Sequence, residues 1–344
     1  MATTVASAVT LAAAVLGGVP LVLGLGLVLL AGVFILPPGA RRYLLRRIAR
    51  VAATVFGAMA IIWLLVHNYP DASRSTPTGV IPAMERYVTW LADALFGEFG
   101  DSSYSETVGE GVSRTIPIST QLLVYSQMLA VLLAVPGALV GARFRGRAVD
   151  VGFRAVALLG LALPIFVVGP IFQYTLGVGD FDLFGMSFGA QVLPVGRYIA
   201  FGENPIEHFR SMALPSLTLG VTTAAIYLVL LRSEIIQQLP LEHVLLARSK
   251  GVRPGRIIRV HALRPAAPSV VAAIAAQTSL LFGNLVIIER IFILPGFGDY
   301  VLVAIGRRDD LAVVGSLFVI ALILGVINLF ADALLLVVDP RLDR

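Results

Sequence analysis

The chain has 344 residues, of which 58% are hydrophobic and only 14% are charged. This composition excludes a soluble globular domain, which could not bury so much apolar surface, and indicates a protein that crosses a membrane several times. Cysteine is absent, which excludes disulfides and thiol chemistry. The formal net charge is +5, but the cations lie in short segments between apolar stretches, which favours a membrane protein over a nucleic-acid-binding one.

The first apolar stretch, residues 2–38, carries no charged side chain. As one helix it would extend roughly 54 Å, compared with a hydrocarbon core of roughly 30 Å. Gly17, Gly18 and Pro20 offer a break, so we favour two short helices over one long tilted span. No cation precedes the apolar run, unlike a standard signal peptide. We therefore predict an extra hydrophobic segment, one helix or a helical hairpin, over residues 1–40.

Five arginines between positions 41 and 50 predict a cytoplasmic end, followed by a span over about 51–66. Residues 68–115 are polar and are predicted to form an outside loop. Within this loop we expect a helix whose apolar face lies in the outer membrane interface. The face consists of Met84, Val88, Leu91 and Leu95, with Tyr87 and Trp90 beside it.

Five later apolar stretches also predict spans. They cover about 118–140, 154–176, 214–231, 266–288 and 311–338. Gly137 and Gly141 are spaced to let another helix approach closely, and Pro164 interrupts the second stretch. Residues 177–211 and 291–310 are predicted to connect spans on the outside. This topology places 18 of the 26 lysines and arginines in cytoplasmic segments, as the positive-inside rule expects.

The stretch from Leu239 to Pro265 is the most basic of these segments. It holds Arg248, Lys250, Arg253, Arg256, Arg259 and Arg264. We predict two short helices, with Gly251 as a left-handed cap after the first and Pro254 in the first turn of the second. Apolar positions recur at helical spacing in the first helix, and Ile257, Ile258 and His261 share a face of the second. Such an amphipathic helix either lies on lipid or docks into another protein.

No catalytic or metal site is predicted. Lys250-Gly251 is in the wrong order for a phosphate-binding Walker A loop, so an ATP-driven function would require a partner chain. Gly185–Gly189 matches G-x-S-x-G around Ser187, but it lies in a loop between spans rather than in a strand-turn-helix. We interpret it as a flexible glycine-rich loop, although His208 in the same loop leaves a membrane-embedded hydrolase as a remote alternative.

Polar residues inside apolar spans are costly and therefore informative. The candidates for lining a solute pathway are Gln173, Gln277, Asn284 and Asn328. Hydrogen bonding between helices is the favoured alternative for any one of them. Asp332, near the end of the last span, is expected to pair with a cation or a helix terminus.

Several motifs together resemble a known family. Ala247-Arg248-Ser249-Lys250-Gly251, followed by Arg259-Val260-His261-Ala262-Leu263-Arg264, resembles the EAA loop of ABC-importer permeases in the dipeptide, oligopeptide and nickel branch. The segments from Glu289 to Gly298 and from Asn328 to Arg341, together with Tyr87 to Ser102, are also similar to that branch. The resemblance covers about 41–344.

The resemblance implies an all-α polytopic membrane protein with a six-helix type I permease core, here with the additional N-terminal segment. It divides the chain into 1–40, a first core helix with its outside loop over 41–117, and a permease core over 118–344. The EAA-type loop would span 233–265, and its first helix would be the coupling helix that contacts the ATPase. The implied coupling residues are Leu241, Glu242, Val244, Leu245, Ala247, Arg248, Ser249, Lys250 and Gly251, supported by Arg259, His261 and Arg264. The usual glutamate position is occupied by Leu245, so Glu242 is a candidate replacement.

The implied partners are a second related permease subunit, two cytoplasmic ABC ATPases and an extracytoplasmic solute-binding protein, all working at the lipid bilayer and without nucleic acid. The chain itself would bind no cofactor, because ATP and Mg²⁺ belong to the ATPases. Transport of peptides or a related small solute would occur by alternating access. A secondary transporter or channel driven by an ion gradient is the alternative, but it would need acidic or histidine relays inside the spans, and the acidic residues cluster at span ends.

Overall fold

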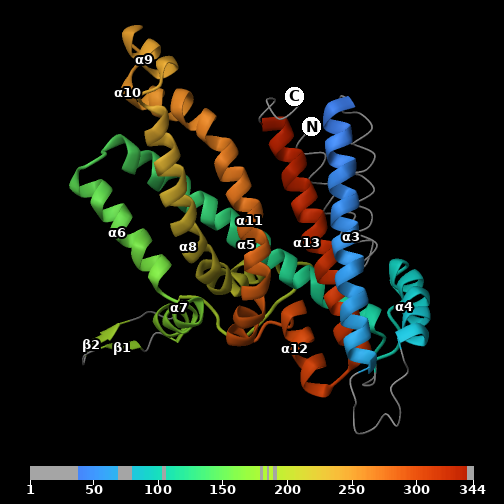
Figure 1. The fold of residues 1–344 in the computed structure, drawn as a ribbon. Coiled ribbons are helices and arrows are strands. Elements are labelled where there is room, and N and C mark those ends of the chain that lie inside the picture. The colour runs from blue at the N-terminus through green and yellow to red at the C-terminus, as the bar shows by residue number, and fades with distance from the viewer. Residues whose placement is uncertain are drawn as a thin grey trace. The chain divides into compact units, whose positions relative to one another are not determined.

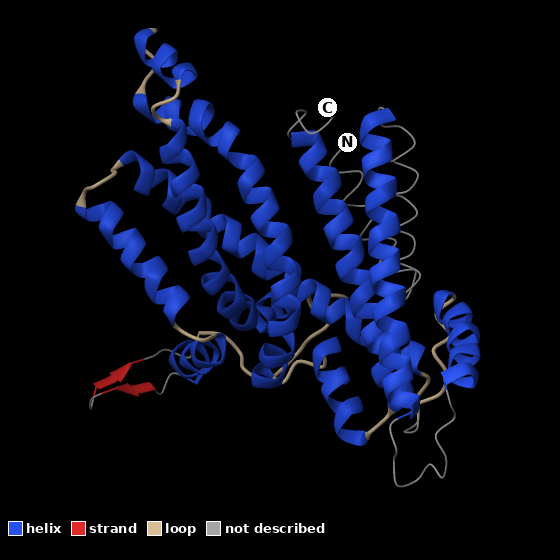
Figure 2. Ribbon diagram, viewed as in Figure 1, coloured by secondary structure: helices blue, strands red, loops and turns tan. Residues whose placement is uncertain are grey.

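A computed structural model of the chain describes residues 38–68, 80–102, 106–178, 181–183, 186–188 and 192–338 (Figure 1). The described chain is almost entirely helical, as expected (Figure 2). It divides into two compact units, one comprising residues 1–119, 296–336 and 340–344 and the other 120–295 and 337–339. The predicted extra segment over 1–40 lies outside the described residues except for its last three.

The first unit contains α3 (Pro38–Asn68), α4 (Val80–Leu95), the start of α5 (Val108–Arg143), α12 (Phe297–Arg307) and most of α13 (Asp310–Val338). Its core is aromatic. The Trp90 ring centroid lies 5.1 Å from that of Trp63 in a tilted contact and 5.7 Å from that of Phe318 in an edge-to-face contact. The Trp63 indole donates a hydrogen bond to the Ala83 carbonyl at 2.9 Å. The Tyr87 hydroxyl donates a hydrogen bond to the Phe56 carbonyl at 2.8 Å. These bonds fix α4 against α3.

The helix expected in the outside loop is confirmed as α4, and its place in the membrane interface stays a prediction. Ala83, Tyr87, Trp90 and Ala94 are buried within the unit. Met84 and Val88, which we expected to lie in the membrane interface, are 40% and 61% exposed. The aromatic residues beside the predicted face thus form the packed face, because they bury more apolar area.

The second unit contains the rest of α5 and the elements up to α11. These are α6 (Ala148–Ala162), α7 (Ile165–Phe172), η1 (Gln173–Val178), β1 (Phe181–Leu183), β2 (Met186–Phe188), α8 (Pro205–Gln238), α9 (Glu242–Ser249), α10 (Pro254–Arg256), η2 (Ile257–Ala262) and α11 (Leu263–Phe292). The long α8 packs against α6, α7 and α11. Asn204 caps its start by accepting hydrogen bonds from the backbone N–H groups of Ile206 and Glu207.

Five helices among the described residues are long and apolar enough to cross a membrane, or six if α6 and α7–η1 together count as one broken span. This confirms the predicted number of core spans. The broken pair bends by 106° at Leu163–Pro164, where a proline disfavours helical backbone in the residue before it. The predicted 154–176 span is therefore two helices that run in different directions, with the bend at Pro164.

Gly137 and Gly141 lie at close helix contacts, as their spacing predicted. A Cβ built on Gly137 would stand 2.7 Å from Leu228 of α8, and one on Gly141 would stand 3.3 Å from Arg232 of the same helix. A side chain at Gly137 would therefore collide with the Leu228 side chain, which would have to shift.

Two connections contain structure that the sequence did not indicate. Residues 291–310, expected only as an outside connection, contain α12. The turn before it places Ile293, rather than a glycine, in the left-handed region, with φ at 54°. The G-x-S-x-G segment, interpreted as a flexible loop, includes an antiparallel hairpin in which Ser187 lies opposite Asp182. A hairpin strand is not the strand-turn-helix that a nucleophilic serine requires.

Candidate coupling surface

The basic stretch folds into the two short helices that the sequence predicted, α9 and then α10 with η2 (Figure 1). The break between them is a Schellman motif. Gly251 has φ at 72°, its N–H donates to the Arg248 carbonyl at 2.9 Å, and the Val252 N–H donates to the Ala247 carbonyl at 3.1 Å. Pro254 occupies the first turn of α10. The turn therefore has a defined geometry that fixes the direction of α9.

The inner side of α9 packs on the second half of the loop. Val244 is fully buried, Ala247 is 6% exposed, and both join Ile257 in a small apolar cluster. The His243 ring nitrogen Nε2 lies 3.2 Å from the His261 carbonyl oxygen, adding a polar link between α9 and η2. Val244 and Ala247, two of the predicted coupling residues, thus hold α9 in place in this conformation.

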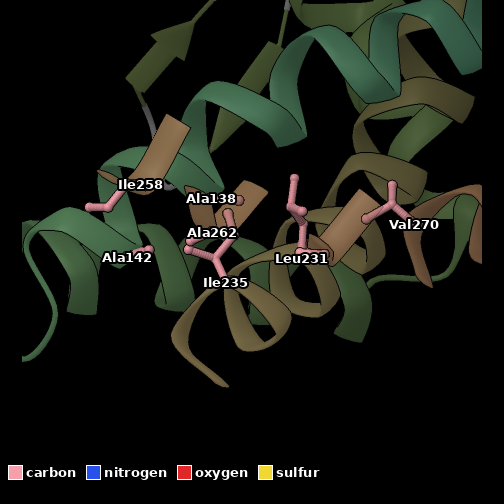
Figure 3. Packing of buried hydrophobic residues seen from close by; sticks show 8 residues of the cluster. Ala138, Ala142, Leu231, Ile235, Ile258, Ala262 and Val270 are labelled. Carbon is pink, nitrogen blue, oxygen red and sulfur yellow. The ribbon is translucent and has the colours of Figure 1, made fainter. Parts of the chain in front are cut away.

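The second half of the loop is in turn anchored to the apolar spans. Ile258 and Ala262 of η2 pack with Leu231 and Ile235 of α8 (Figure 3). Ala138 and Ala142 of α5 belong to the same cluster, and so do Ala266 and Val270 of α11. Because close-packed contacts resist deformation, the loop is a stiff extension of α5, α8 and α11.

The outer side of α9 is apolar and uncovered. The exposed fractions are 45% for Leu241, 50% for Leu245 and 57% for Leu246. Glu242, the first residue of α9, is also exposed, and a carboxylate is favourable at a helix start. The apolar residues that recur along α9 therefore fall on two sides, one packed within the loop and one free to contact another molecule.

Exposed cations follow the outer leucines along the chain. Arg248, Lys250 and Arg264 are exposed, and none of them forms an ion pair within the described part of the chain. The Ser249 hydroxyl donates to the Leu246 carbonyl at 2.8 Å and so belongs to the end of the helix. The Arg259 Nε donates to the Gly255 carbonyl at 3.3 Å. The arrangement suits an apolar contact framed by acidic groups on a partner.

The polar candidates for the solute pathway lie on separate elements. Gln173 begins η1, Gln277 and Asn284 lie on α11, and Asn328 lies on α13. All four are half-buried, and none forms a side-chain hydrogen bond with another described residue. Their role as pathway residues stays a prediction. Asp332 pairs with Arg47, whose Nε lies 2.7 Å from its carboxylate, which confirms the cation expected beside it.

A polar network on three spans was missed from the sequence. The Tyr227 hydroxyl of α8 donates to Gln127 Oε1 of α5 at 2.7 Å, and Gln127 Nε2 donates to the Thr278 hydroxyl of α11 at 2.7 Å. The rule that selected Gln277 would also have selected Gln127, an amide in an apolar span. Its partners could not be foreseen, because they depend on which helices pack together.

A buried ion pair next to the loop was also missed. Asp150 of α6 is fully buried and receives two hydrogen bonds from the Arg232 guanidinium, at 2.6 and 2.7 Å. The Gly146 N–H donates to the same carboxylate at 2.9 Å, which ties the α5–α6 turn to α8. Arg232 lies only six residues before the end of α8 at Gln238, so the pair fixes the helix that carries the loop.

His208, the histidine considered beside Ser187, is fully buried at the start of α8. Its Nδ1 lies 2.7 Å from the Ile199 carbonyl oxygen and its Nε2 lies 3.2 Å from the Tyr125 hydroxyl. Aromatic rings pack around it. Both ring nitrogens are engaged, which favours a structural role. The described residues contain no group of three or more acidic or histidine side chains that could hold a metal ion.

Comparison with known proteins agrees with the resemblance of the motifs. Residues 134–344 match the family described as the inner membrane component of binding-protein-dependent transport systems. The chain is 26% identical over 319 residues to a dipeptide transport system permease protein of Lactococcus lactis, covering 87% of this chain and 98% of that one. A protein of the same name from Alkalihalophilus pseudofirmus is 24% identical over 328 residues, with the same coverage. A Brucella suis protein named as a candidate peptide permease is 28% identical over 263 residues, 76% of this chain and 80% of its own.

The family match spans more than half of the chain and includes the loop, the last three described helices and the C-terminal residues. The apolar helices and the motifs independently indicate the same class. The chain is a multi-pass membrane protein that belongs to the family of inner membrane components of binding-protein-dependent transport systems, the permeases of ABC importers.

Proposed function

We propose that this chain forms half of the translocation pathway of an ATP-driven importer for peptides or a related small solute. Family membership supports a transport subunit, and the names of the two dipeptide permease relatives support the substrate class. The chain lacks a phosphate-binding Walker A loop, so ATP and Mg²⁺ would be bound by partner ATPases. The other partners would be a second related permease subunit and an extracytoplasmic solute-binding protein.

The observation that carries this proposal is the outer face of α9. Leu241, Leu245 and Leu246 present apolar side chains to solvent at the far end of a loop that is otherwise firmly packed. A short amphipathic helix that seats its apolar face in a groove is a common recognition mode. We infer that α9 docks into an ATPase subunit on the cytoplasmic side.

The movement of the ATPases would reach the membrane spans because the loop between them is stiff. When the ATPase pair closes on ATP, α9 moves with it, and the apolar cluster around Ile258 and Ala262 carries that movement into α8 and α11. Rigid spans that tilt together would change the side to which the pathway opens, which is alternating access. A gradient-driven transporter needs titratable relays inside its spans, whereas Asp150 and Asp332 are each held by an arginine.

The test replaces the outer leucines while leaving the inner face intact. We expect Leu245→Asp/Leu246→Asp to lower co-purification of the ATPase subunits at least tenfold, because two half-exposed leucines would otherwise be buried at the contact. Uptake of a radiolabelled dipeptide should fall in parallel. The matched control is Val149→Asp, since Val149 is 47% exposed near the start of α6 and lies outside the loop.

The control should bind ATPase subunits and transport normally. If the leucine variant retains the ATPases and transports at the wild-type rate, α9 is not the coupling helix. If it retains the ATPases but loses uptake, the docking role is wrong even though the loop matters for transport.

A further inference from the structure

The end of α5 and the basic loop enclose an open groove of about 1610 Å³. One wall comes from the last two turns of α5, with Pro136, Leu139, Val140 and Arg143, and the other from the loop between Lys250 and His261. The outer leucines of α9 do not line it. The groove therefore adjoins the proposed ATPase contact at Lys250 and Gly251 but does not include its apolar face.

The groove is strongly cationic. Arg143, Lys250, Arg253, Arg256 and Arg259 line it, and no carboxylate does. None of these five side chains forms an ion pair with another residue that the structure describes. Like charges gathered around one groove repel each other, and an anion among them would remove that repulsion. The position of Arg143 is defined, because its guanidinium lies over the Phe144 ring, 5.6 Å from the centroid.

Apart from His261, the rest of the lining is apolar or glycine and is continuous with the apolar helices. Leu139 and Val140 belong to the span Val108–Arg143, and Ile258 and Val260 belong to the span that begins at Pro254. A Cβ built on Gly255 would lie 3.5 Å from Arg143 Nη1, so glycine lets the loop approach the end of α5. The groove thus has a basic rim at the end of two spans and an apolar wall that leads into them.

We propose that this groove binds an anionic phospholipid, with the phosphate headgroup among the arginines and an acyl chain along the α5 wall. Arginine forks match phosphate oxygens in geometry and charge, and basic pockets between membrane helices suit anionic headgroups. A soluble anion would use the rim but gain nothing from the apolar wall. The lipid, held between α5 and η2, would tie the loop to the span end and stabilise its orientation. This inference does not rest on the proposed transport function.

The experiment measures lipid retention by native mass spectrometry of the purified full-length chain in detergent, titrated with phosphatidylglycerol or with phosphatidylcholine. We expect preferential retention of phosphatidylglycerol. Arg253→Gln/Arg256→Gln should weaken this retention about thirty-fold, because each basic side chain near an anionic headgroup contributes a factor of about five. Arg253→Lys/Arg256→Lys keeps the charge but loses the guanidinium fork, so it should bind more tightly than the glutamine variant and less tightly than the wild type, which separates the loss of charge from a folding defect.

The matched control is Arg42→Gln/Arg145→Gln, which removes the same charge from two exposed arginines outside the groove and should leave retention unchanged. Equal retention of the two lipids, or equal loss in the groove and control variants, would overturn the proposal. So would displacement of the lipid by millimolar inorganic phosphate, which would indicate a simple anion site. If the groove variant retains phosphatidylglycerol but no longer co-purifies with ATPase subunits, these arginines serve the ATPase instead of a lipid.

Discussion

The ion pair between Asp150 and Arg232 offers the sharpest test of how the loop is held. The Asp150 carboxylate is buried and receives three hydrogen bonds, two from Arg232 and one from the Gly146 N–H. Asp150→Ala would leave the guanidinium, whose side chain is only 15% exposed, without its partner. Removing one member of such a buried pair costs about 3–5 kcal/mol.

For a unit of this size, 1 kcal/mol corresponds to about 2–4 °C in the unfolding midpoint. Asp150→Ala should therefore lower the midpoint of the purified chain in detergent by roughly 6–20 °C at a fixed scan rate. Arg232→Ala should lower the midpoint as well, because it leaves the buried carboxylate with only the Gly146 N–H and the more distant Arg154, whose Nε lies 3.9 Å away. In a double-mutant cycle, Asp150→Leu/Arg232→Leu should recover much of the loss, since an apolar pair of similar volume removes both charges.

The matched control is Glu207→Ala, which breaks the exposed pair with Arg210 at 2.9 Å. It should change the free energy of unfolding by less than about 1 kcal/mol and so lower the midpoint by less than about 4 °C. If both single variants at the buried pair unfold within a few degrees of the wild type, the pair does not fix α8. If the double variant is as unstable as the two single variants combined, the cost comes from packing rather than from unpaired charge.

Two further predictions concern the loop itself. Gly251→Val should reduce uptake of labelled dipeptide while membrane insertion stays normal, because a β-branched residue opposes the φ of 72° that closes the Schellman turn. Gly251→Asn should retain most of the uptake, because asparagine tolerates that conformation. Equal loss of uptake in both variants would contradict the reasoning. The chain has no cysteine, so a single introduced cysteine can be labelled selectively. Ser249→Cys should react with an impermeant maleimide only after the cells are permeabilised, whereas Arg197→Cys should react in intact cells. The reverse pattern would place the loop outside.

Much of the fold follows from local rules that the sequence displays directly. Span positions come from apolar length, and the α9–α10 break comes from Gly251 and Pro254, whose backbone preferences need no neighbours. Helix ends were less well predicted. α5 begins at Val108 and α8 at Pro205, each before the apolar run, because polar first turns such as the Asn204 cap extend a helix beyond its membrane core.

Hydrogen bonds and ion pairs between residues far apart in the chain could not be predicted from the sequence. Gln127 lies about a hundred residues from Tyr227 and 151 from Thr278, and Asp150 lies 82 from Arg232. One side chain in an apolar span signals that a partner is needed, but many positions could supply it. The sequence also does not show which side of α9 is buried. With a period of 3.6, Val244 and Leu245 fall on one broad apolar stripe, so the pattern does not separate the inner side chain from the outer one.

The sequence by itself determined that this chain crosses the membrane repeatedly, that its cations gather between spans, and that a capped helical break lies within the most basic segment, because hydropathy, charge and the conformational limits of glycine and proline are properties of the local chain. Only the tertiary structure decided which leucines of α9 stay exposed and which cations line one groove with an apolar wall. Those outcomes depend on which surfaces come together when α5, α8 and η2 pack, and packing is settled by shape and burial between residues that are distant in the chain.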